Sequence, residues 1–261
     1  MYSYTQAYSG LPTKFKKFIQ KIELTDNQRD KIKTSHKHLR EKVLQPLDYV
    51  SHTFLTGSYK KKTLIKPAND IDVFVVLSGY SKDNIKPNTI LDKLKNSLNP
   101  KYPQTTIKQD KPCIVIEFNH VTFELTPAIE IPNYYGGDSN FYIPEMSKNN
   151  RWQNVENPRV LEKSLTKANQ RLNNKLIPLI KMMKHHNKNL RMSGKLASYE
   201  IEKIAIENLS YINDFRDGIE ELLMIYKWCS IWNMKKIKEM SDDDFASLCK
   251  KLLFGSDFPK D

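Results

Sequence analysis

The most informative part of the sequence is FLTGSYKKKTLIKPANDIDVFVVL, residues 54–77. It holds a Gly57-Ser58 pair followed by lysines, then Asp70 and Asp72, and then an apolar run rich in β-branched residues. The run predicts a strand over Asp70–Leu77 that is buried on both faces. Glycine lets the backbone approach a phosphate closely, and the serine hydroxyl adds a hydrogen-bond donor. The stretch therefore predicts a phosphate-sized turn ahead of a strand that begins with two carboxylates.

The two aspartates are spaced so that their side chains share one face of the strand. Residues two apart on a strand lie roughly 6–7 Å apart at their Cα atoms. Two carboxylates this close repel each other unless a positive charge lies between them, which suits a hard divalent cation. A solvated strand end and an ordinary turn are the alternatives for the Asp-Ile-Asp and Gly-Ser features taken singly.

A third carboxylate is predicted on a later hairpin. Strands are expected over Cys113–Phe118 and Val121–Thr126, joined by the two-residue turn Asn119-His120. Glu124 alternates with apolar neighbours, so it lies on the face shared by Thr122 and Thr126. On a strand beside Asp70 and Asp72 it would complete the three-carboxylate arrangement used with two metal ions for phosphoryl or nucleotidyl transfer.

The composition is that of a globular chain able to bury one large core or two interlocked lobes. It has 261 residues, 39% of them hydrophobic and 28% charged, and no apolar run near the roughly 18 residues of a membrane span. The first residues lack the apolar core of a signal peptide, so we expect a cytoplasmic protein without membrane attachment. Three distant cysteines, Cys113, Cys229 and Cys249, predict neither structural disulfides nor zinc.

The formal net charge of +12 predicts affinity for polyanions such as nucleotides or nucleic acid. A lysine-rich surface without a ligand is the alternative reading of this charge. The Lys60-Lys61-Lys62 run has the same two interpretations, since it would either attract nucleotides or an RNA activator, or simply be solvated.

The order of the predicted elements indicates an α+β fold. We expect a mixed sheet with helices in a core over residues 1–150, which includes a long N-terminal helix, and a helical lobe over residues 151–261. The segment IEIPNYYGGDSNFYIPEMSKNNRWQNVENP between them is rich in Pro, Gly and Asn and is interpreted as irregular. Helices are predicted over 25–47, about 89–98, 161–176 with a kink at Pro178, 198–209, about 214–231 and 242–253.

Residues 55–77, LTGSYKKKTLIKPANDIDVFVVL, resemble the signature of the polymerase-β-type nucleotidyltransferases. Later motifs narrow the resemblance to the bacterial CD-NTases, relatives of the animal cyclic GMP-AMP synthase and the oligoadenylate synthetases. These motifs are VTFELTPAIE, YIPEMSKNNRWQNVENP, KLIPLIKMMKHHNK and LASYEIE, and they follow the family order. The resemblance covers about Phe54 to Ile206 and implies a polymerase-β-like core with a C-terminal helical lobe.

The resemblance assigns roles to individual residues. It implies that Asp70, Asp72 and Glu124 hold two Mg²⁺ ions, with Mn²⁺ as a substitute, and that Glu124 helps to activate the acceptor hydroxyl. Gly57 and Ser58 would hold the donor triphosphate. Lys184 and Ser198 would reach the same phosphates, Tyr199 would stack on the donor base, and Glu202 would be structural.

From the residues alone, each assignment on the helical side has a simpler alternative. Lys181, Lys184 and Lys188 share one stripe of a helix, which is also typical of a solvated basic face. Ser198 is also a candidate N-cap, and Tyr199 a packing residue. His185-His186 replaces a tryptophan usual in the family, and we interpret this pair as packing or surface residues rather than metal ligands.

Glu124 is the main departure from the family, whose third acid is usually aspartate. The expected function is synthesis of a cyclic di- or trinucleotide second messenger from NTPs, with release of pyrophosphate, by a monomeric enzyme. Its product would act on an effector in anti-phage defence. Two alternatives remain, which are a nucleotidyltransferase with an RNA or protein acceptor, and a basic RNA-binding protein with a degenerate site.

Overall fold

The computed structural model describes residues 10–67, 70–110, 112–133, 135–145, 150–228 and 231–259. The chain forms two compact units. The sheet unit comprises Leu24–Lys62 and Lys66–Lys163, and the helical unit comprises Met1–Glu23, Thr63–Ile65 and Ser164–Asp261. A search of the described helices for one long and apolar enough to cross a membrane finds none.

This division differs from the expected boundary at residue 150. Two strands on either side of residue 150, β6 (Asn140–Pro144) and β7 (Trp152–Val155), continue the sheet, so both belong with it. The segment interpreted as irregular is therefore partly a β-ribbon, and that prediction was wrong. The first helix, α1 (Leu11–Ile22), belongs to the helical unit.

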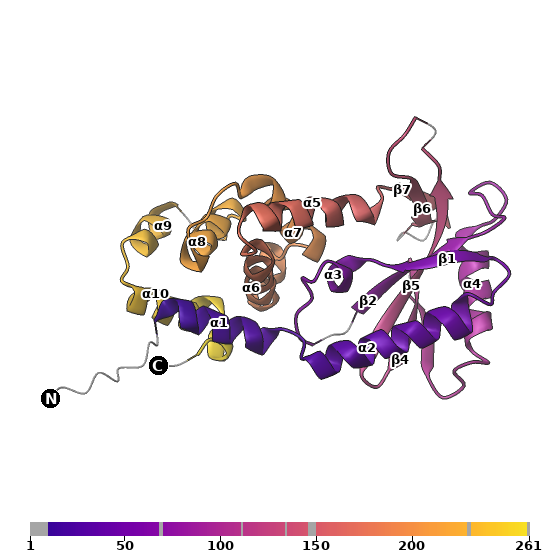
Figure 1. Ribbon diagram of the computed structural model, residues 1–261, viewed down its shortest axis with the longest axis horizontal. Coiled ribbons are helices and arrows are strands. Elements are labelled where there is room, and N and C mark those ends of the chain that lie inside the picture. Colours follow the sequence, from indigo (N-terminus) through magenta and orange to yellow (C-terminus); the bar gives the residue numbers. More distant parts are fainter. Residues whose placement is uncertain are drawn as a thin grey trace. The chain divides into compact units, whose positions relative to one another are not determined.

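A seven-stranded sheet forms the centre of the sheet unit (Figure 1). Its main path has the order β1-β2-β5-β4-β3, and β6 and β7 extend it from the end of β5. β2 and β5 pair in parallel, whereas every other strand pair in the described chain is antiparallel. The strands of the main path are β1 (Val50–Leu55), β2 (Asp70–Leu77), β3 (Thr106–Asp110), β4 (Cys113–Phe118) and β5 (Val121–Ile131).

One face of this sheet is apolar and covered by helix. Ile71, Val73 and Val75 of β2 are fully buried there, beside Phe123 of β5. The helix α2 (Asp26–His38), extended by the π-helical turn η1 (Leu39–Leu44), runs across the sheet in Figure 1. The ring of His36 stacks on Phe123 with 6.3 Å between centroids.

The other side chains of β2, which alternate with these, point to the opposite face of the sheet. Asp70 and Asp72 lie there in line with Phe74 and Val76. Phe74 and Val76 form a small apolar cluster there with Ala128 and Phe141. At β2, one face of the sheet is thus buried core, while the other is apolar at the carboxyl end of the strand and acidic at its start.

Most predicted elements of the sheet unit are confirmed. The β4–β5 hairpin turns at Asn119-His120, and α4 (Pro87–Leu98) covers the helix expected near residues 89–98. The N-terminal helix begins with the capping box expected from Thr25 and Gln28, although its last regular turn ends at Leu44 rather than Leu47. The short helix expected after the Gly-Ser turn is α3 (Gly57–Lys60).

The helical unit is built around one apolar core. Phe15 and Phe18 of α1 lie in it with Leu179 of the sixth helix and Phe254 near the C-terminus. The helix predicted through residues 161–176 is two helices, because residues 172–175 interrupt it. The helices are α5 (Pro158–Arg171), which begins in the sheet unit, α6 (Leu176–Asn189), α7 (Ser198–Asn208), α8 (Phe215–Ile225), α9 (Ile231–Lys238) and α10 (Asp242–Leu248).

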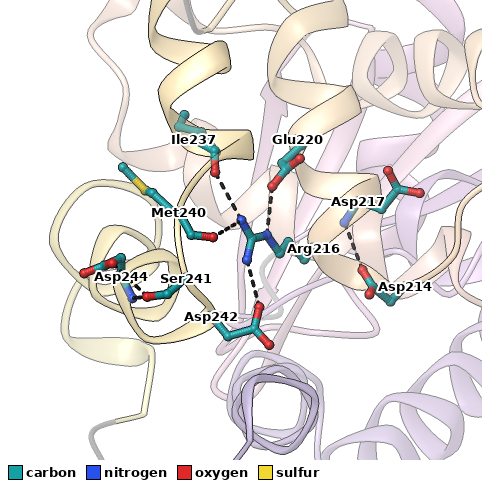
Figure 2. Close-up of polar contacts among 9 residues, drawn as sticks. All are labelled: Asp214, Arg216, Asp217, Glu220, Ile237, Met240, Ser241, Asp242 and Asp244. Atoms are coloured by element: carbon teal, nitrogen blue, oxygen red, sulfur yellow. Dashed lines mark hydrogen bonds and ion pairs between the residues drawn. The ribbon is translucent and has the colours of Figure 1, made fainter.

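Arg216 joins the last three of these helices, as Figure 2 shows. Its guanidinium donates to Glu220 Oε1 at 2.9 Å and Asp242 Oδ1 at 2.8 Å, and to the carbonyl oxygens of Ile237 and Met240. The Arg216 side chain is only 18% exposed and that of Glu220 9%, so their ion pair is largely shielded from water, whereas the Asp242 side chain is 65% exposed. One side chain thereby ties α8 to the end of α9 and the start of α10.

Two of the three cysteines lie among the described residues. Cys113 and Cys249 are free and buried. Cys229 lies outside the described residues, so the expectation for it is not tested.

Candidate functional site

The predicted acidic residues of the sheet unit lie on one face of two adjacent strands. β2 and β5 are parallel and in register, so that Asp72 is opposite Glu124 and Asp70 is opposite Thr122. Side chains at paired positions of neighbouring strands point to the same face. The expectation that Glu124 lies beside the two aspartates is therefore confirmed as a matter of position.

Burial and like charge together disfavour an ionised Glu124. Burial is the larger cause, and the carboxylates of Asp72 and then Asp70 add to it, raising the pKa of Glu124 to about 7. An ordinary glutamate has a pKa near 4.5. The start of β2 is thus a place where negative charge is concentrated in a partly dry environment, which favours a cation.

Sequence reasoning missed two further residues at this end of the sheet. Asp110 ends β3 and pairs with Cys113 at the start of β4, and the Cys113 thiol donates to the Asp110 carbonyl oxygen. Asp110 also contributes to the raised pKa of Glu124. Burial, followed by the charges of Glu124 and Asp110, raises the pKa of Cys113 to about 12, so this thiol stays protonated. The polar strand that carries Asp110, TIKQD, offers no apolar alternation by which to recognise it.

Gly57 lies directly against one of the aspartates. Its φ of +64° is in the left-handed region, and a Cβ added to it would lie 1.7 Å from Asp72 Oδ2. The backbone N–H of Thr56 donates to the Asp72 carbonyl oxygen at 2.9 Å. The Gly57-Ser58 turn and Asp72 therefore form one local structure, and only glycine leaves room for the carboxylate.

The donors at this site suit Mg²⁺ by their chemistry. Carboxylate oxygens are the ligands that this ion takes in proteins, and the repulsion felt by Glu124 is what a cation would offset. Asp70, Asp72 and Glu124 are the residues that would hold it. Within the ranges that the structure describes, no three His, Cys, Asp or Glu residues are grouped as a metal site. Metal binding therefore stays a prediction.

Lys184 lies in the helical unit and is buried in an ion pair. It is 5% exposed, and its Nζ donates to Glu202 Oε1 at 2.6 Å and to Thr63 Oγ1 at 3.0 Å. The Thr63 hydroxyl in turn donates to Glu202. Glu202 thus has the packed environment expected of a structural residue, whereas a phosphate contact by Lys184 stays a prediction.

The alternative of a solvated basic face on α6 is wrong for two of its lysines. Lys181 is also buried, and it pairs with Glu23 at 2.6 Å. Both lysines are thus matched by carboxylates from other parts of the helical unit. Sequence periodicity places them on one stripe but does not reveal these partners, because Glu23 and Glu202 are far from α6 in the chain.

Ser198 and Tyr199 begin α7. The N-cap is Ala197, and Glu200 accepts from its backbone N–H at 2.7 Å, so Ser198 is the first helical residue and the N-cap alternative is wrong. Tyr199 is 58% exposed, which also argues against the packing alternative. An exposed ring is available for stacking on a base, but that role is a prediction.

The two histidines after Lys184 have the packing roles expected of them. His186 is buried and its Nδ1–H donates to the Leu253 carbonyl oxygen at 2.9 Å, while His185 Nε2 lies 2.9 Å from Asp257 Oδ2.

In the Lys60-Lys61-Lys62 run, Lys60 forms an ion pair with Glu162 at 3.3 Å.

The architecture is that of a polymerase-β-like nucleotidyltransferase fold. It combines a mixed sheet, in which the strand carrying the aspartates runs parallel to the strand carrying Glu124, with a Gly-Ser turn against the aspartate strand and a separate helical lobe. Residues 10–169 match the family model of the Second Messenger Oligonucleotide or Dinucleotide Synthetase domain. The chain therefore belongs to this family, which confirms the recognised resemblance to the bacterial CD-NTases.

Two curated relatives illustrate the sequence similarity. The chain is 26% identical over 211 residues to the "Probable cyclic nucleotide synthase" of Bacillus cereus strain VD146, covering 68% of this chain and 62% of the relative. It is 33% identical over 108 residues to the "Probable cyclic AMP-AMP-GMP nucleotide synthase" of Salmonella paratyphi B, covering 39% and 28%. The matched region thus spans less than two thirds of either relative.

Solved structures share the fold at low sequence identity. CdnC of E. coli MS115-1, solved with ATP, has a TM-score of 0.71 and 15% identity, covering 95% of this chain and 99% of that one. DncV of Vibrio cholerae, a cyclic AMP-GMP synthase solved with a linear intermediate, has a TM-score of 0.64 and 12% identity, covering 83% and 78%. These similarities confirm the predicted α+β fold.

Proposed function

We propose that this protein is a nucleotidyltransferase that joins nucleoside triphosphates into a cyclic di- or trinucleotide. The observation that carries the proposal is the register of Asp72 with Glu124 beside the Gly57 turn. Curated relatives named as synthases of cyclic AMP-AMP-GMP and cyclic AMP-AMP-AMP support this class of product.

The reaction forms a bond between a ribose hydroxyl oxygen and the α-phosphorus of a second nucleotide, and breaks the bond from that phosphorus to the departing pyrophosphate. Asp70 and Asp72 place negative charge where bound cations are needed, and Mg²⁺ would supply neutralisation of the triphosphate and polarisation of the acceptor hydroxyl. Glu124 orients that hydroxyl and accepts its proton. Two such steps close a cyclic dinucleotide, and three close a cyclic trinucleotide.

The resemblance to the CD-NTases suggests roles for the other predicted residues. Gly57 and Ser58 hold the donor triphosphate because their backbone lies against Asp72. Lys184, Ser198 and Tyr199 bind the donor nucleotide from the helical unit. We place the reaction in the cytoplasm, where NTPs are abundant, with an effector in anti-phage defence responding to the product.

Incubation of the purified protein with four NTPs and Mg²⁺, followed by mass spectrometry, tests the proposal. We expect a cyclic oligonucleotide from the wild type and none from Glu124→Gln, which is isosteric but cannot be anionic. Glu124→Asp, which restores the usual acid of the family, should retain measurable synthesis. The same incubation with added RNA separates the alternatives, because nucleotides attached to RNA or to the protein would point to a macromolecular acceptor. No product under any condition, with Mg²⁺ or Mn²⁺, would leave only a nucleotide- or RNA-binding role.

A further inference from the structure

The segment Thr63–Ile65 belongs to a different unit from the chain on either side of it. Both flanking stretches are part of the sheet unit, whereas these three residues are part of the helical unit. Thr63 is fully buried, and Ile65 lies in the apolar core of the helical unit. In the sequence, the segment separates the Gly57-Ser58 turn from Asp70, so it interrupts the stretch that carries the proposed catalytic residues.

The Thr63 hydroxyl takes part in a buried network of the helical unit. It donates to Glu202 and accepts from Lys184 Nζ at 3.0 Å, while Lys184 Nζ also donates to Glu202 Oε1 at 2.6 Å. The side chains of Lys184 and Glu202 are 5% and 1% exposed, so the network is shielded from water. Hydrogen bonds to charged groups are stronger than those between neutral groups, so the network holds Thr63 firmly in place.

Two residues join Thr63 closely to the end of α3. The Lys61 N–H donates to the Gly57 carbonyl oxygen at 3.2 Å. The Lys62 N–H donates to the Tyr59 carbonyl oxygen at 3.1 Å, and Lys62 has a left-handed φ of +61°, which most side chains avoid. Because both residues are bonded back to α3, little slack remains between Gly57 and Thr63.

We propose that Thr63 is a positioning residue for the donor triphosphate. Held by Lys184 and Glu202, it fixes the end of α3 and thereby the Gly57 backbone that lies against Asp72. The proposal rests on the proposed nucleotidyl transfer, in which this turn holds the triphosphate. Thr63 acts on the rate of transfer through the turn and makes no contact with a nucleotide itself.

Thr63→Val tests this role, because valine has nearly the same shape without the hydroxyl and leaves the Lys184–Glu202 ion pair in place. With saturating NTPs and Mg²⁺, the rate of product formation should fall by roughly tenfold to a hundredfold, since in-line transfer is sensitive to misplacement of about 1 Å. The affinity for ATP should change by less than about threefold, because no phosphate contact is removed. Thr63→Ser retains a hydroxyl and should recover most of the rate, which a role in packing alone does not predict.

Tyr226→Phe is the matched control. The Tyr226 hydroxyl is buried in the same unit and donates to the Ile201 carbonyl oxygen at 2.7 Å. Ile201 precedes Glu202 on α7, so this variant also removes a buried hydroxyl close to the network, but it leaves the bonds of Thr63 intact. It should be less stable in urea than the wild type and should keep the wild-type rate.

Hydrogen exchange over residues 56–62, measured by mass spectrometry without nucleotide, tests the effect on the turn independently of activity. The Lys61 and Lys62 amides should exchange roughly fivefold faster in Thr63→Val than in the wild type. Their exchange should be unchanged in Tyr226→Phe. If circular dichroism shows that Thr63→Val is unfolded, Thr63→Ala takes its place with the same expected results.

The proposal is overturned if exchange in the turn is the same in Thr63→Val and the wild type, or if Thr63→Val keeps the wild-type rate. An equal loss of rate in Tyr226→Phe, or a loss that Thr63→Ser does not recover, also overturns it. If the wild type itself makes no product, the proposed function fails, and the exchange measurement alone decides whether Thr63 positions the turn.

Discussion

At the scale of single residues, the tightest constraint is the contact between Gly57 and Asp72. Any side chain at position 57 would overlap the carboxylate and would also adopt a left-handed φ of +64°. The sequence shows that a glycine precedes a serine here, but not that this glycine lies against an aspartate fifteen positions later. That second fact depends on the antiparallel pairing of β1 with β2.

Gly57→Ala should abolish most of the catalytic activity while costing little stability. Displacing the Asp72 carboxylate by about 1 Å is enough to slow a reaction by on the order of 100-fold. The left-handed backbone at this position should lower the free energy of unfolding by roughly 1–2 kcal/mol. Product formation and urea unfolding are the measurements.

Gly79→Ala is the control for backbone strain, since Gly79 has a φ of +74° and nothing within 4 Å of an added Cβ. It should lose similar stability and keep its activity. Equal activity in the two variants would show that the contact with Asp72 does not matter.

Asp72→Asn should stop synthesis and leave the melting temperature level or higher. The native carboxylate repels Glu124 and Asp70, and its neutral isostere does not, so the substitution removes an unfavourable interaction from the metal-free protein. Differential scanning calorimetry in EDTA measures the stability, with Asp83→Asn, an exposed aspartate outside the site, as control. A clear loss of stability in Asp72→Asn, or retained synthesis, would contradict the assignment of Asp72.

At the scale of elements, helices and strands with a clear apolar pattern are the ones that the sequence predicts correctly. β2 and β4 are recognisable in the sequence because they are nearly continuous apolar runs, and the β4–β5 hairpin is recognisable from its two-residue turn. β3 and β7 are polar edge strands, held by ladder bonds to neighbours rather than by their own composition. α1 was missed although Leu11, Phe15, Phe18 and Ile22 have helical spacing, so its signal was present in the sequence.

Arg216→Met should destabilise the helical unit by about 3–5 kcal/mol. It removes the cation that balances the buried Glu220 and leaves the carbonyl oxygens of Ile237 and Met240 without this donor (Figure 2). Urea unfolding followed by circular dichroism measures the change. Lys203→Met is the control, because its pair with Glu207 is exposed and should contribute less than about 1 kcal/mol. Similar losses in the two variants would refute a joining role for Arg216.

His186 should make the folded protein less stable as the pH is lowered. Burial lowers the pKa of this histidine below its ordinary 6.5, an effect that outweighs its hydrogen bond to Leu253. As the pH falls below 6.5, the unfolded chain takes up a proton that the folded chain resists, so stability is lost. His186→Asn retains an N–H that can donate to Leu253 but cannot be charged. Between pH 7 and pH 5.5, the wild type should therefore lose more unfolding free energy than His186→Asn does. A difference between the two proteins that stays constant with pH would contradict this explanation.

At the scale of the whole molecule, the chain order alone predicted an α+β protein with a helical C-terminal part. It did not predict that the sheet unit takes residues up to Lys163, nor that Thr63–Ile65 belongs with the helices. The composition of a short segment does not reveal which unit it belongs to, because long-range contacts decide this. Asp70 and Asp72 were identified because their motif is local, whereas the ion pairs of Lys181 and Lys184 join residues that are distant in the chain.

Whether the helical unit contributes to nucleotide binding depends on what Lys184 does besides holding Glu202. Lys184→Met should cost about 3–5 kcal/mol of stability, because it leaves the Glu202 carboxylate buried without its cation, and Lys184→Met/Glu202→Met should recover most of that loss. If Lys184 also contacts a phosphate, the recovered double variant should still bind ATP roughly tenfold to a hundredfold more weakly than the wild type. The Lys181→Met/Glu23→Met variant is the matched control, since it removes the other well-shielded pair of α6 and should leave ATP affinity unchanged. Wild-type ATP affinity in the Lys184→Met/Glu202→Met protein would show that this lysine serves the fold of the helical unit alone.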